Sequence, residues 1–184
     1  MANVAAEYEP GLIVCVTGPE SSGKTTLASE LARALAVPLV TEVARDYLAG
    51  RKNYDADDLL AIAKAQLSAE QNALAEGTGL VICDTDLQVI QIWWQEKFGE
   101  LDPWLVEALS ERSPRRYLLA FPDLPWEPDP LRESAEDRER LFDRYCVALQ
   151  DESFSYAEVR GNGGERFELA LQTVQEWLSE PIFE

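Results

Sequence analysis

Short apolar runs alternate along this chain with longer stretches in which apolar residues recur every three or four positions. A continuous apolar run is typical of a strand that is covered on both faces of a parallel sheet. The predicted strands are Leu12–Thr17, Pro38–Thr41, Leu80–Cys83, Tyr117–Ala120 and Tyr156–Val159. The predicted helices are Thr25–Leu35, Asp55–Glu76, Leu87–Phe98, Pro103–Ser110, Ser134–Gln150 and Gly164–Leu178. This alternation predicts an α/β fold with a doubly wound, five-stranded parallel sheet, in one domain over residues 1–184.

The segment "GPESSGKT", residues 18–25, follows the first predicted strand and opens the first predicted helix. It fits the P-loop pattern G-x-x-x-x-G-K-[ST], whose glycines let the backbone approach an anion and whose N–H groups surround phosphates. Lys24 is expected to contact the β- and γ-phosphates and Thr25 to coordinate Mg²⁺. The residues expected at the nucleotide are Gly18, Glu20, Ser21, Ser22, Gly23, Lys24, Thr25 and Thr26. The motif predicts ATP and Mg²⁺ as cofactors and a P-loop fold of the nucleotide-kinase type; the alternative is a glycine-rich turn that binds nothing.

Acidic side chains follow two further predicted strands. Asp84 and Asp86 lie in "LVICDTD", and Glu42 lies with Arg45 in "TEVARDY". If the second and third strands flank the first, these groups meet at its C-terminal edge, where ligands of α/β proteins bind. Asp84 is then a candidate Mg²⁺ ligand, and Glu42 or Asp86 is a candidate base. Arg45 is a candidate either to clamp phosphate or to orient a carboxylate. The alternative for Asp84 and Asp86 is a cap on the next helix.

Composition excludes several classes of function. The net charge of −18 argues against nucleic-acid binding, which depends on Lys and Arg at phosphates. The chain has no histidine, which excludes histidine-based acid–base chemistry and histidine metal sites. No apolar run approaches the ~18 residues of a membrane span, and the first ten residues do not read as a signal peptide. The cysteines, Cys15, Cys83 and Cys146, are expected as buried thiols in a cytoplasmic protein.

The P-loop motif does not identify the reaction, but other motifs and the chain length reduce the number of P-loop classes that fit. No N-K-x-D element of a GTPase is present, and a motor or AAA+ assembly needs more chain. A small-molecule kinase is therefore the preferred interpretation, with a helical lid at approximately residues 127–145. Arginines are frequent in that region: Arg132, Arg138, Arg140 and Arg144. The alternative for this segment is a solvated helix with i,i+4 ion pairs, such as Glu136 with Arg140.

Five segments, which follow one another in this order along the chain, together resemble a known protein family. They are "GPESSGKTTLA", "TEVARDY", "DTD" before an aromatic-rich helix, "PDLPWEPDPLR" and "YAEVRGNGGERFELA". Together they resemble the kinase domain of NadR-type proteins, the nicotinamide riboside kinases, over about residues 11–178. The resemblance implies transfer of phosphate from ATP to the 5′-hydroxyl of nicotinamide riboside. It also implies two aromatic residues around the nicotinamide ring, matching Trp126 and Tyr156, with Asp129 or Glu127 at the ribose.

Two points leave room for other functions. Tyr156 is also explained as a core residue, and the pair Trp93 and Trp94 is interpreted as helix packing. The chain has Pro130 where the family usually has glycine, and proline restricts the backbone at the lid. The adenylyltransferase domain of longer relatives is not expected in a chain without histidine. The alternatives are a kinase for another nucleoside, a regulatory P-loop ATPase and a degenerate nucleotide-binding module.

Overall fold

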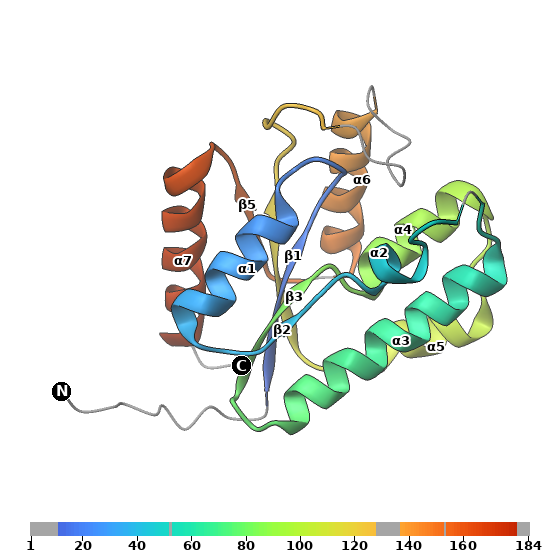
Figure 1. Cartoon of the computed structure of the whole chain (residues 1–184), viewed down its shortest axis with the longest axis horizontal. Coiled ribbons are helices and arrows are strands. Elements are labelled where there is room, and N and C mark those ends of the chain that lie inside the picture. The colour runs from blue at the N-terminus through green and yellow to red at the C-terminus, as the bar shows by residue number, and fades with distance from the viewer. Residues whose placement is uncertain (1–10, 52, 128–136, 153, 180–184) are drawn as a thin grey trace.

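The chain folds into a parallel sheet with helices on both faces (Figure 1). The computed structural model describes residues 11–51, 53–127, 137–152 and 154–179. The strands are β1 (Leu12–Thr17), β2 (Leu39–Val40), β3 (Leu80–Asp84), β4 (Arg115–Ala120) and β5 (Tyr156–Val159). The helices are α1 (Lys24–Leu35), α2 (Val43–Tyr47), α3 (Ala56–Ala75), α4 (Leu87–Lys97), α5 (Pro103–Ser110), α6 (Arg138–Asp151) and α7 (Gly163–Ser179). The predicted five-stranded α/β fold is confirmed.

The strand order is β2-β3-β1-β4-β5, and all four pairings are parallel. The expectation that the second and third strands flank the first is therefore wrong in one respect. β3 lies between β2 and β1, and the other neighbour of β1 is β4. Glu42, after β2, consequently lies one strand farther from the phosphate loop than Asp84, at the end of β3.

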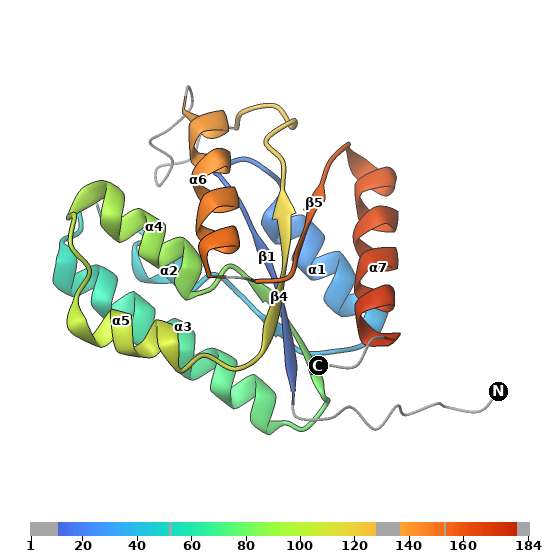
Figure 2. The same ribbon diagram turned by 180° about the vertical axis from the view of Figure 1, so that it is seen from behind.

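The two faces of the sheet are covered by different helices. The side chains of Leu12, Val14 and Val16 pack under α1 and α7. Those of Ile13 and Cys15, which alternate with them, pack toward α3 and α6. Figures 1 and 2 show the two helix layers on opposite sides of the sheet. Because both faces are covered, β1 is buried along its whole length, which explains its continuous apolar sequence.

A third apolar cluster joins α2, α3, α4 and α5 beyond the sheet. α3 begins with a capping box between Asp55 and Asp58, and α5 begins with the Asp102 cap followed by Pro103. The short helix α2 was not predicted, because its five residues "VARDY" are too few to show a helical period. It follows β2 directly, with Glu42 at its N-cap position and Arg45 within it.

Three further observations bear on the sequence-based expectations. Cys15, Cys83 and Cys146 are free thiols, the first two fully buried. No helix in the described part of the chain has the length and hydropathy needed to cross a membrane. Of the expected lid, residues 128–136 lie outside the described residues, and so does the predicted helix start at Ser134; α6 covers Arg138–Asp151.

Candidate functional site

The phosphate loop joins the end of β1 to the start of α1, as its sequence predicts. Gly18 has φ 135°, and a Cβ placed there would lie 2.6 Å from the carbonyl oxygen of Ala120. Gly23 has φ 78°, and a Cβ there would lie 2.7 Å from the Leu124 side chain. Both positions therefore require glycine, because a side chain would strain the backbone and collide with β4 or the loop after it. α1 directs its N-terminal end at the loop.

Two side chains brace this loop from inside. The Ser22 hydroxyl donates to the Pro19 carbonyl at 2.7 Å, and the Lys24 ammonium donates to the same carbonyl at 2.8 Å. The Lys24 side chain thus folds back over the loop and reaches Pro19, five residues earlier in the sequence. An ammonium in this position is ready to exchange the carbonyl for a phosphate oxygen.

Asp84 lies behind the start of α1 and is only 2% exposed. Burial raises the pKa of this carboxyl, and the charge of Glu42 acts in the same direction. A hydrogen bond with the Thr25 side chain, and the charges of Lys24 and Arg45, act against this shift. One carboxylate oxygen, Oδ1, has no hydrogen-bond partner. A buried carboxylate oxygen without a partner, beside a threonine hydroxyl, is the kind of oxygen donor set that Mg²⁺ uses together with phosphates and water.

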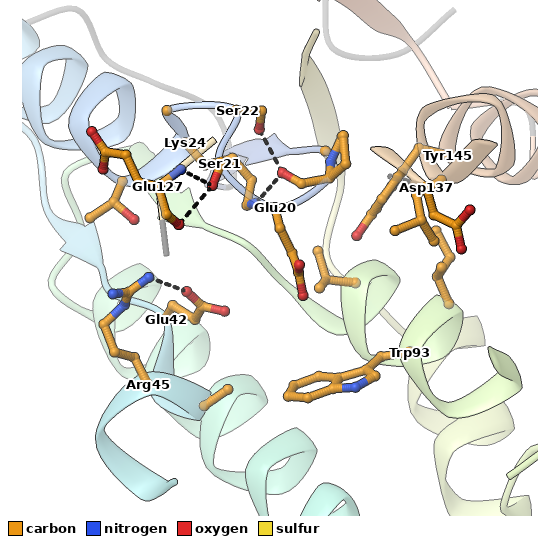
Figure 3. A pocket seen from close by; sticks show the side chains of 18 of the residues that line it. Glu20, Ser21, Ser22, Lys24, Glu42, Arg45, Trp93, Glu127, Asp137 and Tyr145 are labelled. Atoms are coloured by element: carbon orange, nitrogen blue, oxygen red, sulfur yellow. Dashed lines mark hydrogen bonds and ion pairs between the residues drawn. The ribbon is translucent and has the colours of Figure 1, made fainter. Parts of the chain in front are cut away.

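A cavity of about 660 Å³ extends from the phosphate loop to α4 (Figure 3). From the expected site it includes Gly18, Glu20, Ser21, Ser22, Gly23, Lys24, Thr25, Thr26, Glu42, Arg45, Glu127 and Arg140. Glu42 and Arg45 form an ion pair at 3.7 Å on the wall formed by α2. The volume is in the range of small-molecule sites, about 300–1,000 Å³. The cavity therefore brings the phosphate loop, an acid and an arginine to one space.

The expectation that Asp86 faces the phosphates is corrected. Thr85 has φ 69°, and after this turn Asp86 is fully buried at the N-cap of α4. There Asp86 accepts from the backbone N–H of Gln88, from Arg115 at 2.7 Å and from the Tyr117 hydroxyl at 2.7 Å. The capping alternative is thus what the structure shows for this residue. The nearby Arg115 and Arg112 guanidinium groups lower the pKa of Asp86 against the effect of its burial.

The expected aromatic pair is also separated. Tyr156 begins β5 and pairs in register with Tyr117, and its hydroxyl accepts from Gln150 near the C-terminal end of α6. Because β5 runs parallel to β1, its first residue lies away from the edge where the phosphate loop begins. Trp126 lies beside Arg138, whose guanidinium is 5.8 Å from its ring centroid. The described structure therefore does not bring Trp126 and Tyr156 together.

The lid arginines have different positions. Arg138 donates to the Leu124 carbonyl at 2.9 Å, whereas Arg140 lines the cavity. Arg140 and Arg144 both contact the Glu96 carboxylate of α4, and their hydrogen bonds lower its pKa. Two other expected residues, Asp129 and Arg132, lie outside the described residues, as does Pro130.

Several cavity residues were missed by the sequence reasoning: Tyr54, Trp93, Glu96, Lys97, Asp137 and Tyr145. For Trp93 a signal was available. Adjacent residues on a helix point about 100° apart, so Trp93 and Trp94 point in different directions and are not equally buried. Trp94 is the buried member, 6% exposed, and Trp93 is half-buried at the cavity.

Arg166 was also not predicted as a site residue from the sequence, although it bonds to the phosphate loop on the side that faces α7. It is buried in α7 and donates to the carbonyls of Ser22, Gly161 and Phe121, and it pairs with Asp123. This guanidinium therefore joins the phosphate loop to the segments after β4 and β5. The "RGNGGER" segment thus contacts the loop on the side away from α2.

A family model described as an AAA domain matches residues 13–166. The trifunctional NAD biosynthesis/regulator protein NadR of Salmonella typhimurium (strain LT2) is 25% identical over 189 aligned positions, which cover 96% of this chain and 46% of the relative. The protein of the same name from Escherichia coli (strain K12) is also 25% identical, over 187 positions, with the same two coverages. The chain thus spans less than half the length of these curated relatives.

Solved structures share the fold. NadR in complex with NR has a TM-score of 0.78 at 22% identity, covering 95% of this chain and 53% of that one. NadR in complex with NAD and AMP-PNP has a TM-score of 0.75 at 22% identity, covering 95% and 52%. Thymidylate kinase from Ehrlichia chaffeensis has a TM-score of 0.63 at 18% identity, covering 92% and 100%. The resemblance to NadR-type kinase domains is confirmed, and the fold is one that nucleotide kinases also have.

Proposed function

The chain belongs to the AAA domain family, and from that membership and the geometry of its phosphate loop we propose that it is an ATP- and Mg²⁺-dependent kinase. The proposed acceptor is the 5′-hydroxyl of nicotinamide riboside, and the product is nicotinamide mononucleotide. One observation carries the proposal. Lys24 and Thr25 begin α1 at one end of a cavity, Asp84 lies behind Thr25, and Glu42 lines the same cavity from α2. The NadR relatives, and the solved structure of a NadR protein in complex with NR, support the choice of acceptor.

The groups of the site divide the work of phosphoryl transfer. The backbone of the loop and the N-terminal end of α1 hold the phosphates, and Lys24 stabilises charge on the transferred group. Thr25 and Asp84 would hold Mg²⁺, which neutralises phosphate charge when bound. The acceptor oxygen forms a bond to the γ-phosphorus, the bond to the bridging oxygen breaks, and ADP leaves. Glu42 accepts the hydroxyl proton, because it lines the cavity and its charge acts on Asp84, which places this carboxylate near the proposed metal site.

A kinase for another nucleoside is the second candidate, and a specific observation favours it. The pair Trp126 and Tyr156, which the resemblance assigned to the nicotinamide ring, is not assembled in the described structure. The fold of a thymidylate kinase is also similar. The first measurement is therefore ADP release from ATP and Mg²⁺ with nicotinamide riboside, uridine, adenosine or thymidine. Stimulation by nicotinamide riboside supports the first candidate, and stimulation by another nucleoside supports the second.

Replacing Lys24 tests the phosphate site itself. Lys24→Ala is expected to lower turnover by about 100-fold or more, because a preorganised charge on the transferred group is lost. Its thermal stability is expected to stay near that of the wild type, because the ammonium bonds to a carbonyl of the phosphate loop and is not part of the apolar core. Lys64→Ala is the matched control, since Lys64 is exposed on α3 and lies over Trp104, away from the cavity.

The dependence of ADP release on the acceptor and the turnover of Lys24→Ala together test the proposed kinase function. A folded Lys24→Ala protein with wild-type turnover would contradict the assigned phosphate site. ATP hydrolysis that no nucleoside stimulates would contradict the kinase and favour the regulatory ATPase.

A further inference from the structure

Trp93 is the aromatic side chain of α4 that lines the cavity. In the close view its indole points from α4 toward Glu42, with Glu20 of the phosphate loop above it (Figure 3). The neighbouring Trp94 points into the core instead, where its Nε1–H donates to the Glu100 carbonyl at 2.9 Å. Trp93 packs in part against the apolar cluster of α2, α3, α4 and α5, and the rest of its half-buried indole offers a flat surface at the cavity wall.

The orientation of Trp93 is held by its neighbours. Its Nε1–H donates to the Tyr54 hydroxyl at 2.5 Å, and the two rings meet edge to face with centroids 5.0 Å apart. The Lys97 ammonium lies 3.3 Å from the centroid of the Tyr54 ring. Tyr54 is thus held by Lys97 and in turn holds Trp93. An indole that is already ordered loses little conformational entropy when a ring stacks on it.

Trp93 lies on the side of the phosphate loop from which the acceptor is expected to approach. In-line transfer requires the attacking oxygen to lie opposite the leaving oxygen, so donor and acceptor approach the γ-phosphate from opposite sides. On one side of the phosphate loop, Arg166 of α7 occupies the space behind Ser22. The cavity extends on the other side, past Glu42 and Arg45 to Trp93. A nucleoside whose hydroxyl meets Glu42 therefore directs its base toward α4.

We propose that Trp93 is the surface on which the base of the acceptor nucleoside stacks, and that Tyr54 is a positioning residue for it. This inference rests on the proposed kinase function. The charges beside Trp93 indicate how the base is recognised. The Glu96 carboxylate is paired with Arg140 and Arg144, and Lys97 adds a further cation. The wall is therefore suited to a flat base of any charge, selected by stacking rather than by an ion pair.

Kinetics of Trp93 variants test the assignment. Trp93→Ala is expected to raise the KM for the acceptor about 10-fold or more, because loss of one base–aromatic stack has an effect of that size. The KM for ATP is expected to stay unchanged. Trp93→Phe keeps a ring and is expected to retain most of the affinity for the acceptor. Trp104→Ala is the matched control: Trp104 is also half-buried, with Lys64 over its ring, but it lies outside the cavity.

A binding measurement separates this inference from the kinase proposal. Each nucleoside of the panel is titrated without ATP while tryptophan fluorescence is followed in wild type and Trp93→Phe. Quenching that Trp93→Phe loses supports the stacking site, even if no nucleoside is phosphorylated and the kinase proposal fails. The inference is overturned if no nucleoside quenches wild type, if the quenching persists in Trp93→Phe, or if Trp93→Ala leaves the acceptor KM unchanged. If Trp93→Ala raised the KM for ATP as much as the KM for the acceptor, Trp93 would belong to the ATP site, and the inference would also be overturned.

The role of Tyr54 has its own readout. Tyr54→Phe removes the hydroxyl that accepts from Trp93 but keeps the ring under Lys97. The acceptor KM is expected to rise less than in Trp93→Ala, and the variant Trp93→Phe/Tyr54→Phe is expected to show no further rise over Trp93→Phe. Additive effects in the double variant would overturn the positioning role.

Discussion

At the scale of single residues, the buried ion cluster of Asp86, Glu70, Arg112 and Arg115 shows how position decides the chemistry of a carboxylate. Asp86 lies 2.7 Å from Arg115 and remains ionised, because two guanidinium groups and a tyrosine hydroxyl surround it. Glu70 lies 3.3 Å from the same arginine, and its Oε1 has no hydrogen-bond partner. Burial raises the pKa of Glu70 from 4.5 to about 7, with the charge of Asp86 adding to the shift and that of Arg115 opposing it.

This raised pKa predicts a pH-dependent stability. Between pH 4.5 and about 7 the folded state holds a proton on Glu70 that the unfolded state has lost, so stability falls as pH rises through this window. Glu70→Gln removes the titration. Relative to wild type, its free energy of unfolding is expected to rise by up to about 3 kcal/mol from pH 4.5 to 8. Urea unfolding of both proteins across this range measures the difference, and parallel curves would refute the prediction.

At the scale of elements, one side chain of α3 joins the two segments that carry the acids. Gln66 is 1% exposed; its Oε1 accepts from the Val43 N–H at 3.1 Å, and its Nε2 donates to the Thr85 carbonyl at 3.4 Å. Val43 follows Glu42, and Thr85 follows Asp84. The long helix α3 therefore sets the spacing between the ends of β2 and β3 through a single amide.

Replacing that amide is expected to affect turnover more than nucleotide affinity. Gln66→Leu leaves the Val43 N–H without its partner, with an expected loss of about 1–3 kcal/mol of stability. A lower kcat with little change in the KM for ATP is expected, because Glu42 and Asp84 lose their fixed spacing while the phosphate loop is untouched. Gln71→Leu on the exposed side of α3 is the matched control. Equal kcat values for Gln66→Leu and the control would show that the spacing is held in another way.

At the scale of the whole molecule, the cavity is formed by segments from most of the chain. The phosphate loop, α2, α4 and the start of α6 all contribute to it, and α7 supports the loop through Arg166. A ligand that bridges these segments stabilises the folded state relative to the unfolded one by mass action. The stability of the entire domain therefore reports binding at the site.

Thermal unfolding with ATP tests the metal assignment at this scale. ATP at about 100 times its dissociation constant is expected to raise Tm by roughly 5–10 °C, and Mg²⁺ is expected to be needed for the full effect. Asp84→Asn is expected to lose the part that depends on Mg²⁺ while the protein stays folded, because burial already disfavours the charge of Asp84. Asp57→Asn, at an exposed position of α3, is the control. A wild-type Tm shift that is equal with and without Mg²⁺ would contradict the role of Asp84.

Much of the architecture and part of the site were predictable from local sequence. The strand β1, the phosphate loop and α1 were predicted within a residue, because strand period, glycine conformation and helix amphipathicity are properties of neighbouring residues. The short helix α2 was not predicted, since five residues carry no clear period. Asp84 and Asp86 show the same limit: two residues apart in sequence, they lie on opposite sides of a turn with positive φ at Thr85.

By itself, the sequence determined that a parallel sheet presents a phosphate loop, because a fully apolar strand and the glycine pattern that follows it act over a few residues. Only the tertiary structure decided which other side chains meet that loop. Strand order placed Glu42 two strands from β1, the direction of β5 separated Tyr156 from Trp126, and the rotation of α4 brought Trp93 rather than Trp94 to the cavity. These placements depend on how distant segments pack, and such contacts leave no periodic signal in the chain.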